Sequence, residues 1–290
     1  MMNQRTESTH SHAIPALLRE REFNRFSAFI YDEVGIKMPP AKKTMLEARL
    51  QKRLKALGLG SFEEYADFVF SSAGNSDEII HLIDVVTTNK TDFFREPVHF
   101  DYLVKSAIPS LIKDHEAGFR TPFKIWSAGC STGEEPYTLA MVLSEFSGAH
   151  PGFRTSILAS DISTEVLSKA RNAIYTEDRV DTIPLQLKKK YLLKSRDSSK
   201  GLVRISPELR SMVQFRRLNF MEEFGVQEKM DIIFCRNVII YFDKPTQERL
   251  LNRFHQQLCR GGYLFLGHSE TLNGLDVPLV PVASTVYRKG

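Results

Sequence analysis

The most constraining feature of this sequence is the stretch 125–137, which reads Ile-Trp-Ser-Ala-Gly-Cys-Ser-Thr-Gly-Glu-Glu-Pro-Tyr. A short apolar run over residues 123–126 is typical of a buried strand, and a helical pattern of apolar residues begins near Glu135. Between them, Gly129 and Gly133 permit positive φ angles and let a ligand approach the backbone closely. The new helix directs its unpaired N–H groups back over this turn. The stretch therefore predicts a strand, a tight turn and a helix that suit a nucleotide-like cofactor.

The turn lacks the patterns that bind phosphates. It contains neither the P-loop pattern G-x-x-x-x-G-K-[S/T] nor the dinucleotide pattern G-x-G-x-x-G. Glu134 and Glu135 occupy the first helical turn, where they favour the helix macrodipole but repel a phosphate anion. A ligand that carries positive charge fits better, and S-adenosylmethionine has both a sulfonium and an ammonium group. The alternative is an ordinary strand-to-helix turn whose two glutamates only stabilise the start of the helix.

Length and composition bound the class of protein. At about 100 to 200 residues per domain, 290 residues with 42% hydrophobic content predict two domains with substantial cores. No apolar run approaches the roughly 20 residues that span a bilayer, and the polar residues 1–12 do not resemble a signal peptide. Cys130, Cys235 and Cys259 are too widely spaced for a disulfide framework or a metal-ligand pattern. We therefore expect a cytoplasmic protein without membrane insertion and without a bound metal.

The N-terminal part of the chain predicts an all-helical domain. Residues 1–15 have no periodicity and are expected to form a disordered tail. Helical spacing of apolar residues predicts helices over residues 16–34, 41–57, 61–70 and 77–86. Glycines end the first two helices, at Gly35 and Gly58, and Ser61 with Glu64 forms a capping box at the start of the third. Because no strand pattern precedes residue 120, we assign residues 16–88 to one helical domain.

The helix predicted over residues 41–57 concentrates positive charge. It holds six basic residues and one acid, so its net charge of +5 exceeds the +4 of the whole chain. On a helical projection, Lys42, Arg49, Lys52 and Arg53 gather beside an apolar stripe of leucines. A charged flank of this kind is typical of a solvated helix face, but its one-sidedness equally favours docking on an acidic partner.

Residues 89–290 alternate between helical and strand patterns, which predicts an α/β domain. Residues 155–159 form the second apolar, β-branched run, which ends in Ser160-Asp161. An acid at the carboxyl end of this strand suits the paired hydroxyls of a ribose, and it equally suits a helix N-cap.

The later part of this domain contains further strands. Apolar runs at 192–193, 202–205 and 212–215 predict a small antiparallel subdomain inserted at about residues 191–217. We then expect a long strand over 230–241 interrupted by Arg236-Asn237, a helix over 244–260 capped by Gly261-Gly262, a strand over 263–266 and an edge strand at 286–287.

Five motifs, taken together, resemble those of a known family. They read TTNKTDFFRE at 87–96, WSAGCSTGEEPY at 126–137, SDI at 160–162, FCRNVIIYF at 234–242 and GHSE at 267–270. In this order and with this domain plan they closely resemble the chemotaxis receptor methyltransferases of the CheR type, over nearly the whole chain. Each motif alone is weak, but five in register make the resemblance specific.

The resemblance implies a class I S-adenosylmethionine-dependent methyltransferase domain of Rossmann-like α/β fold, with a small inserted β-subdomain and a preceding helical domain. It implies transfer of a methyl group to glutamate side chains of the chemoreceptor cytoplasmic helical bundle, with S-adenosylhomocysteine as the second product and no metal. The helical domain, with its basic flank, would dock on the receptor.

The resemblance also implies residue roles. The cofactor-binding positions are Asn89, Thr91, Arg95, Glu134, Asp161, Asn219, Phe220, Arg236 and Asn237. Arg95 can bind the methionine carboxylate with two parallel hydrogen bonds, and Asn219 with Phe220 can offer an amide and a flat apolar surface to adenine. We expect Arg95 and Tyr241 to orient the incoming carboxylate. The alternatives are a helix-start role for Glu134 and simple packing for Tyr241.

Two other functions compete with this one. The basic helix suggests a nucleic-acid methyltransferase, but residues 236–238 read Arg-Asn-Val where amine methyltransferases of that kind resemble one another in a Pro-Pro-Tyr turn. The other competitor is a non-catalytic S-adenosylmethionine sensor or scaffold.

Some family members bind a peptide from the receptor C-terminus through a glycine-containing turn of the small sheet. The turn 194–201 retains only Gly201, which leaves this partner open.

Overall fold

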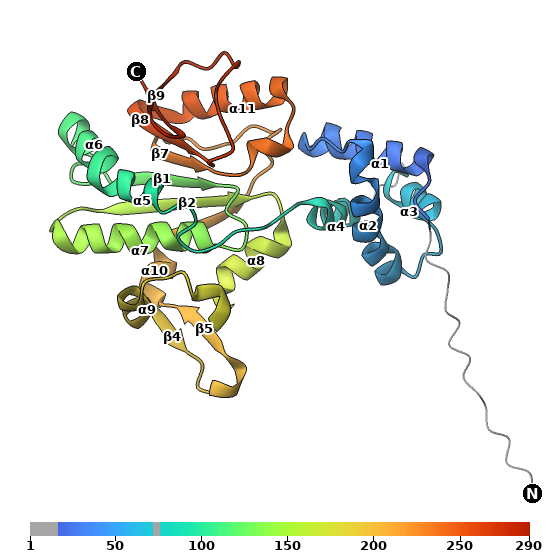
Figure 1. Cartoon of the computed structure of the whole chain (residues 1–290), viewed down its shortest axis with the longest axis horizontal. Coiled ribbons are helices and arrows are strands. Elements are labelled where there is room, and N and C mark those ends of the chain that lie inside the picture. Colours follow the sequence, from blue (N-terminus) through green and yellow to red (C-terminus); the bar gives the residue numbers. More distant parts are fainter. Residues whose placement is uncertain (1–16, 72–75) are drawn as a thin grey trace, which may run out of the picture. The chain divides into compact units, whose positions relative to one another are not determined.

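The computed structural model describes residues 17–71 and 76–290, so the tail predicted at residues 1–15 lies outside the described residues. The chain divides into two compact units (Figure 1). One takes in the described residues up to Phe29 together with Met38–Val86, and the other comprises Ile30–Lys37 and Thr87–Gly290. Among the described residues, none of the helices has the length and apolar character that crossing a membrane requires.

The N-terminal unit is helical, as its apolar periodicity predicts. Its helices are α2 (Lys43–Leu57), α3 (Phe62–Val69), α4 (Ser76–Val86) and the first part of α1 (Glu20–Val34), whose residues from Ile30 belong to the larger unit, with a 3-10 turn at Pro40–Lys42. The leucine stripe of α2 is buried, and Gly58 ends this helix with a φ of 69°. Ser61 Oγ accepts the N–H of Glu64 at 3.1 Å, whereas the Glu64 carboxylate binds the N–H of Gly60 rather than that of Ser61.

The larger unit is built on a seven-stranded sheet with the order β6-β2-β1-β7-β8-β10-β9. The strands are β1 (Phe123–Ala128), β2 (Thr155–Asp161), β6 (Val213–Arg217), β7 (Met230–Cys235), β8 (Leu258–Leu266), β9 (Leu279–Ala283) and β10 (Val286–Lys289). The first five strands in the sheet order run parallel, and β10 is antiparallel to both β8 and β9.

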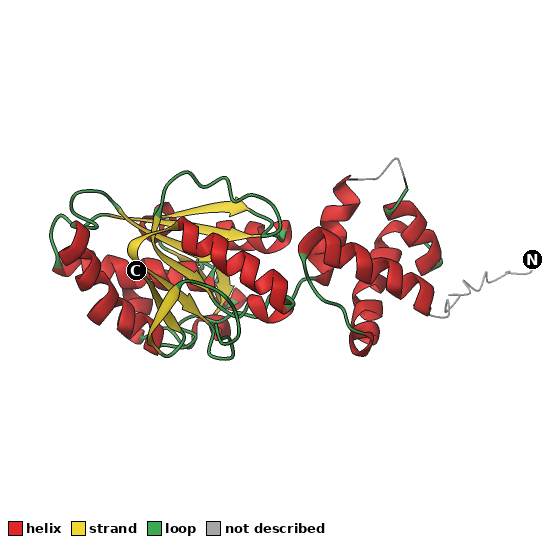
Figure 2. Ribbon diagram, turned by 90° about the horizontal axis from the view of Figure 1, so that it is seen from above, coloured by secondary structure: helices red, strands yellow, loops and turns green. Residues whose placement is uncertain are grey.

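Helices cover both faces of this sheet (Figure 2). They are α5 (Val98–Tyr102), α6 (Ile108–His115), α7 (Glu134–Ala149), α8 (Thr164–Asn172), α10 (Pro207–Ser211) and α11 (Lys244–Gln257), whereas α9 (Leu185–Tyr191) lies beside the smaller sheet described below (Figure 1). Because strand side chains alternate between faces, Ile125 and Phe234 join the core that contains α7 residues. Trp126 and Ile233 instead pack in the core that contains Leu250, Leu251 and Phe254 of α11.

A second, three-stranded antiparallel sheet has the order β3-β5-β4, from β3 (Ile174–Thr176), β5 (Leu202–Ile205) and β4 (Leu192–Lys194). The expectation that residues 212–215 belong to this small sheet is wrong, because β6 pairs in parallel with β2 of the main sheet. The subdomain therefore begins near residue 174 rather than 191. The period-2 pattern of residues 212–215 indicated a strand correctly, but such a pattern does not name the strand's partner.

Three other boundaries differ from the sequence prediction. The strand predicted over 230–241 ends at Cys235, and Ile239–Tyr241 forms a 3-10 turn. Gly261 and Gly262 lie inside β8 rather than capping α11. β10 is not an edge strand, because β9 pairs with its outer side. A π-helical turn at Leu103–Ala107 separates α5 from α6.

Candidate active site at the carboxyl ends of β1, β2 and β7

The turn after β1 is shaped by glycine. Gly129 has a φ of 84°, and a Cβ atom at this position would lie 2.5 Å from Cγ2 of Val238. Gly133 has a φ of 100° and precedes α7, which begins at Glu134. Both positions thus require glycine for conformation and for space. Gly129 lets the turn after β1 lie against Val238 in the turn after β7, at the place where the strand order of the sheet reverses, whereas Gly133 lies against Ala170 and Tyr175.

Asp161 ends β2 and is held by two backbone groups. Its Oδ2 accepts the N–H of Ser131 at 2.8 Å, and its Oδ1 accepts the N–H of Ser163 at 3.0 Å. The N-cap of α8 is Ser163, whose hydroxyl accepts the N–H of Val166. The buried Asp161 carboxylate therefore joins two neighbouring turns instead of capping the helix.

The segment 87–96, which precedes α5, crosses the same edge of the sheet. Ser131 Oγ donates to the carbonyl of Asn89 at 2.9 Å, and Arg179 donates to the carbonyl of Thr91 at 2.7 Å. The N–H of Phe94 binds Thr138 Oγ1 of α7 at 3.1 Å. These contacts place Asn89 and Thr91, two predicted cofactor positions, beside the turn after β1.

Glu134, whose side chain is 1% exposed, forms an ion pair with Arg179, whose side chain is 39% exposed. Its Oε1 lies 2.5 Å from Arg179, and its Oε2 accepts the hydroxyl of Thr132 at 2.6 Å. The carboxylate thus stabilises the turn and the segment that contains Arg179. This partner supports the alternative, local role for Glu134 more than direct cofactor contact.

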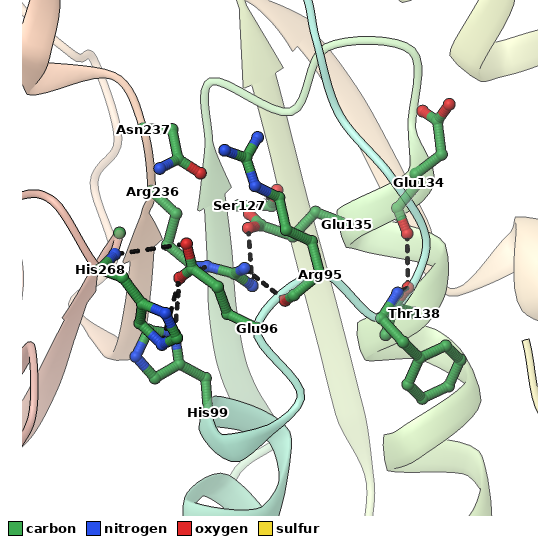
Figure 3. A network of polar contacts seen from close by, with 12 residues as sticks. Arg95, Glu96, His99, Ser127, Glu134, Glu135, Thr138, Arg236, Asn237 and His268 are labelled. Carbon is green, nitrogen blue, oxygen red and sulfur yellow. Dashed lines mark hydrogen bonds and ion pairs between the residues drawn. The ribbon is translucent and has the colours of Figure 1, made fainter. Parts of the chain in front are cut away.

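Arg236, directly after β7, is the centre of a polar cluster (Figure 3). Its side chain is only 2% exposed. Its Nε lies 3.3 Å from Glu96 and its Nη1 lies 3.4 Å from Glu135, while its Nη2 donates to the carbonyl of Arg95. Arg236 was predicted to touch the cofactor, but this burial favours a positioning role in which it fixes Arg95 and two carboxylates.

The two carboxylates around Arg236 differ in acidity. Burial raises the pKa of Glu135, although Arg236 and the Ser127 hydroxyl, 2.7 Å away, oppose that rise. For Glu96, burial also opposes ionisation, but Arg236 and the N–H of His268 outweigh it, so its pKa lies below the ordinary value. Glu96 is therefore the firmly ionised member of the pair.

Glu270 holds the turn that follows Arg236. Its Oε2 accepts the N–H groups of Asn237 and Gly267 at 2.8 and 2.7 Å, and its Oε1 accepts those of Val238 and Ile240 at 2.9 and 3.3 Å. Asn237 adopts a positive φ of 58° inside this turn. Tyr241 lies at the end of the same turn, so its backbone position depends on Glu270.

Comparison with known proteins decides the family. Residues 89–287 match the model described as CheR methyltransferase, SAM binding domain, and residues 21–87 match the CheR methyltransferase, all-alpha domain. The chain belongs to the CheR methyltransferase family. It is 44% identical to the chemotaxis protein methyltransferase of Borreliella burgdorferi, over 92% of this chain and 94% of that protein. It is 40% identical to the Escherichia coli protein of the same name, over 93% of this chain and 91% of that protein.

Membership of the CheR family confirms the predicted class I S-adenosylmethionine-dependent methyltransferase fold and the cofactor. The donor set at the strand ends fits S-adenosylmethionine. Asp161, an acceptor-only carboxylate, ends β2, and two glutamates rather than basic groups begin α7. That arrangement suits ribose hydroxyls and a cationic ligand, and it opposes a phosphate.

Two predicted adenine contacts are engaged with the backbone and with other rings in this CheR chain. The Asn219 amide donates to the carbonyl of Glu33 at 2.7 Å and accepts the N–H of Met221 at 3.0 Å. The Phe220 ring packs 5.7 Å from that of Phe254, between centroids. Both residues follow β6, on the same edge of the sheet as Asp161, so their contact with adenine stays a prediction.

Two basic side chains of the α2 flank, Arg49 and Arg53, bind partners within the helical unit. Arg53 forms a bidentate ion pair with Glu78, which is 3% exposed, at 2.9 and 2.6 Å. Arg49 donates to the carbonyl of Val86. The Arg53 charge is therefore paired within the helical unit, and its contact with a receptor stays a prediction. Lys52 is exposed, Lys42 is partly exposed, and Lys55 adds an exposed charge one turn from Lys52.

Sequence reasoning missed several residues of the CheR site. Glu96 and Glu270 lie inside the motifs that carried the resemblance, but the motifs alone assigned them no role. Arg179 lies in the 3-10 turn Glu177–Val180, outside every motif, and no signal in the sequence pointed to it. His99 and His268 also escaped notice, because the fold brings them together from distant parts of the chain.

Proposed function

We propose that this methyltransferase transfers a methyl group to glutamate side chains of chemoreceptor cytoplasmic helices and forms glutamate methyl esters. The curated relatives named above are chemotaxis protein methyltransferases. The observation that carries the proposal is the placement of Arg95. Arg236 donates a hydrogen bond to the backbone carbonyl of Arg95. The half-buried guanidinium of Arg95 donates to the carbonyl of Lys90 at 3.1 Å and lies beside Glu135 (Figure 3).

A glutamate substrate needs little activation. Its carboxylate is already ionised at neutral pH, so the reaction does not require a general base. When bound, S-adenosylmethionine supplies an electrophilic methyl group that its own sulfonium charge activates. The protein's task is then to position the carboxylate and to exclude water.

Arg95 and Tyr241 are the residues that we assign to the substrate carboxylate. A guanidinium can bind a carboxylate through two parallel hydrogen bonds, which fixes both distance and direction. Tyr241 can donate its phenolic O–H to a second oxygen lone pair. Glu270 and Arg236 would hold these two side chains by fixing the backbone on which each is carried.

For the cofactor, we assign Asp161 to the ribose hydroxyls and Asn219 with Phe220 to the adenine. Asn89, Thr91 and Asn237 surround the turn after β1 and offer polar groups to the amino-acid part. Arg236 and Glu134 support these residues from behind through the ion pairs described above. A negative first turn of α7 favours the positive charge that the cofactor brings.

The proposed partner is the glutamate-rich helical surface of a receptor. Lys52 and Lys55 of α2, both exposed, provide a positive patch that would steer an acidic helix toward the enzyme. Whether the small sheet also binds a receptor C-terminal peptide is a separate question, which a truncated receptor would answer.

The experiment is a transfer assay with S-adenosylmethionine labelled on its methyl group and a chemoreceptor cytoplasmic fragment. We expect label on the receptor that alkali releases as methanol, because esters hydrolyse in base. Label on nucleic acid, or on an alkali-stable position of the receptor, would contradict the proposal. Cofactor binding without any transfer would instead support the sensor alternative.

A further inference from the structure

Glu96, His99 and His268 form a cluster on one side of Arg236 (Figure 3). Each offers one ligand atom, and these three atoms lie within 4.8 Å of one another. Glu96 Oε2 is 3.5 Å from His99 Nδ1 and 3.9 Å from His268 Nε2. In a tetrahedral zinc site the ligand atoms are separated by about 3.4 Å, given metal–ligand bonds of about 2.0 to 2.2 Å. Small side-chain rotations would bring the three atoms to that spacing.

A second observation points to a ligand between them. His99 is 2% exposed, and its Nδ1 is a buried atom without a hydrogen-bond partner. Its other ring nitrogen, Nε2, lies 2.9 Å from Thr285 Oγ1. With the proton on Nε2 and donated to Thr285, the Nδ1 lone pair faces the ionised Glu96. In that tautomer the lone pair is available to a cation that lies beside the Glu96 carboxylate.

We propose that Glu96, His99 and His268 bind a divalent transition-metal ion of the Zn²⁺ type, with a fourth position left to water. Two imidazole nitrogens and one carboxylate oxygen are ligands that Zn²⁺ accepts readily. With the proton on Nε2, the contact to Thr285 Oγ1 at 2.9 Å is the supporting hydrogen bond that metal-binding histidines usually have. Because the His268 side chain is 53% exposed, an ion can enter from solvent.

The surrounding charges are compatible with this site. Burial and the nearby Arg236 lower the pKa of His99 to about 4, so its imidazole is neutral, as a metal ligand must be. Arg236 already contacts Glu96, but it keeps Glu135 and the carbonyl of Arg95 as partners if Glu96 turns to an ion.

The proposed metal site shares Glu96 with the Arg236 cluster, but ion binding can be tested without cofactor and without receptor. The full chain, stripped of metals with a chelator, is titrated with Zn²⁺ in a calorimeter and with Co²⁺ in a spectrophotometer. We expect one ion per chain and a visible Co²⁺ spectrum without a thiolate charge-transfer band. His268→Ala, a change at an exposed side chain, should weaken Zn²⁺ binding by about 10-fold or more.

The matched control is His81→Ala, which removes an exposed histidine of α4 and should leave the dissociation constant unchanged. Glu96→Gln serves as a second ligand variant and should weaken binding by a similar factor. Less than one equivalent of bound Zn²⁺, or equal affinity in His268→Ala and the wild type, would overturn the proposal. A thiolate band would also overturn it, since the ion would then lie on a cysteine.

Discussion

Glu270 accepts the backbone N–H of Asn237 at 2.8 Å and links the loop after β8 to the turn after β7. The same carboxylate binds three more N–H groups, so a single buried side chain satisfies four donors. Unsatisfied buried donors cost about 1 to 3 kcal/mol each. The backbone that leads to Tyr241 therefore has one principal anchor.

Glu270→Gln replaces one acceptor oxygen by an NH₂ group that faces N–H donors. We expect the free energy of unfolding to fall by about 1 to 3 kcal/mol and kcat for methyl transfer to fall more than tenfold. Urea denaturation and steady-state kinetics measure the two effects. Glu223→Gln, at an exposed position, is the control. A loss of stability with unchanged kcat would mean that the turn does not support catalysis.

Arg236→Lys tests the buried cluster. Lysine keeps the charge but lacks the planar fork, and it cannot bind Glu96, Glu135 and the Arg95 carbonyl together. We expect a loss of unfolding free energy on the order of 2 kcal/mol. Arg288→Lys, which alters a half-exposed pair with Asp114, should cost about 0 to 1 kcal/mol. Equal losses of unfolding free energy in the two variants would show that the Arg236 cluster contributes no more to stability than a half-exposed ion pair.

Asp161→Asn should weaken cofactor binding. The substitution keeps the size of the side chain but turns one acceptor into a donor, so S-adenosylmethionine affinity should fall by about 1 to 3 kcal/mol. Calorimetry gives the value. Asp231→Asn is a matched control, because Asp231 also accepts a backbone N–H, that of Lys124, at the opposite edge of the sheet. If both variants bind the cofactor like the wild type, Asp161 only joins the two turns.

Two substitutions in α2 distinguish an effect on receptor docking from an effect on folding. Arg53→Glu places a carboxylate against buried Glu78, and loss of such a pair costs about 3 to 5 kcal/mol of stability. Lys52→Glu changes an exposed residue and should alter stability by about 0.5 kcal/mol or less. We expect Lys52→Glu to raise KM for the receptor, with a smaller difference at high ionic strength. An unchanged KM would move the docking surface away from α2.

Much of the fold follows from periodicity in the sequence. The apolar runs of β1, β2 and β7 and the leucine stripe of α2 predicted elements that the structure contains. The strand β3 escaped notice because its three residues are too few to establish an alternating pattern in the sequence. Local patterns indicate that a strand exists, but the pairing of β6 with β2 depends on the whole chain.

Site residues could be predicted from the sequence only where they lie in a recognisable motif. Asp161 and the turn after β1 could be found because strand ends meet at one edge of a parallel sheet. The ion pairs could not, since Arg53 on α2 meets Glu78 on α4, and Arg179 meets Glu134, across distant parts of the chain. A helical projection shows which residues share a face but not which acid lies opposite.

Peptide mapping of the receptor fragment shows whether receptor glutamates become methyl esters. After incubation with enzyme and S-adenosylmethionine, mass spectrometry should find a single added methyl group on glutamate residues, removed by mild alkali. Arg95→Lys enzyme should give far less of it at saturating cofactor, because the planar fork is lost. Methyl groups on lysine, arginine or other alkali-stable positions, or an unmodified receptor, would contradict the account.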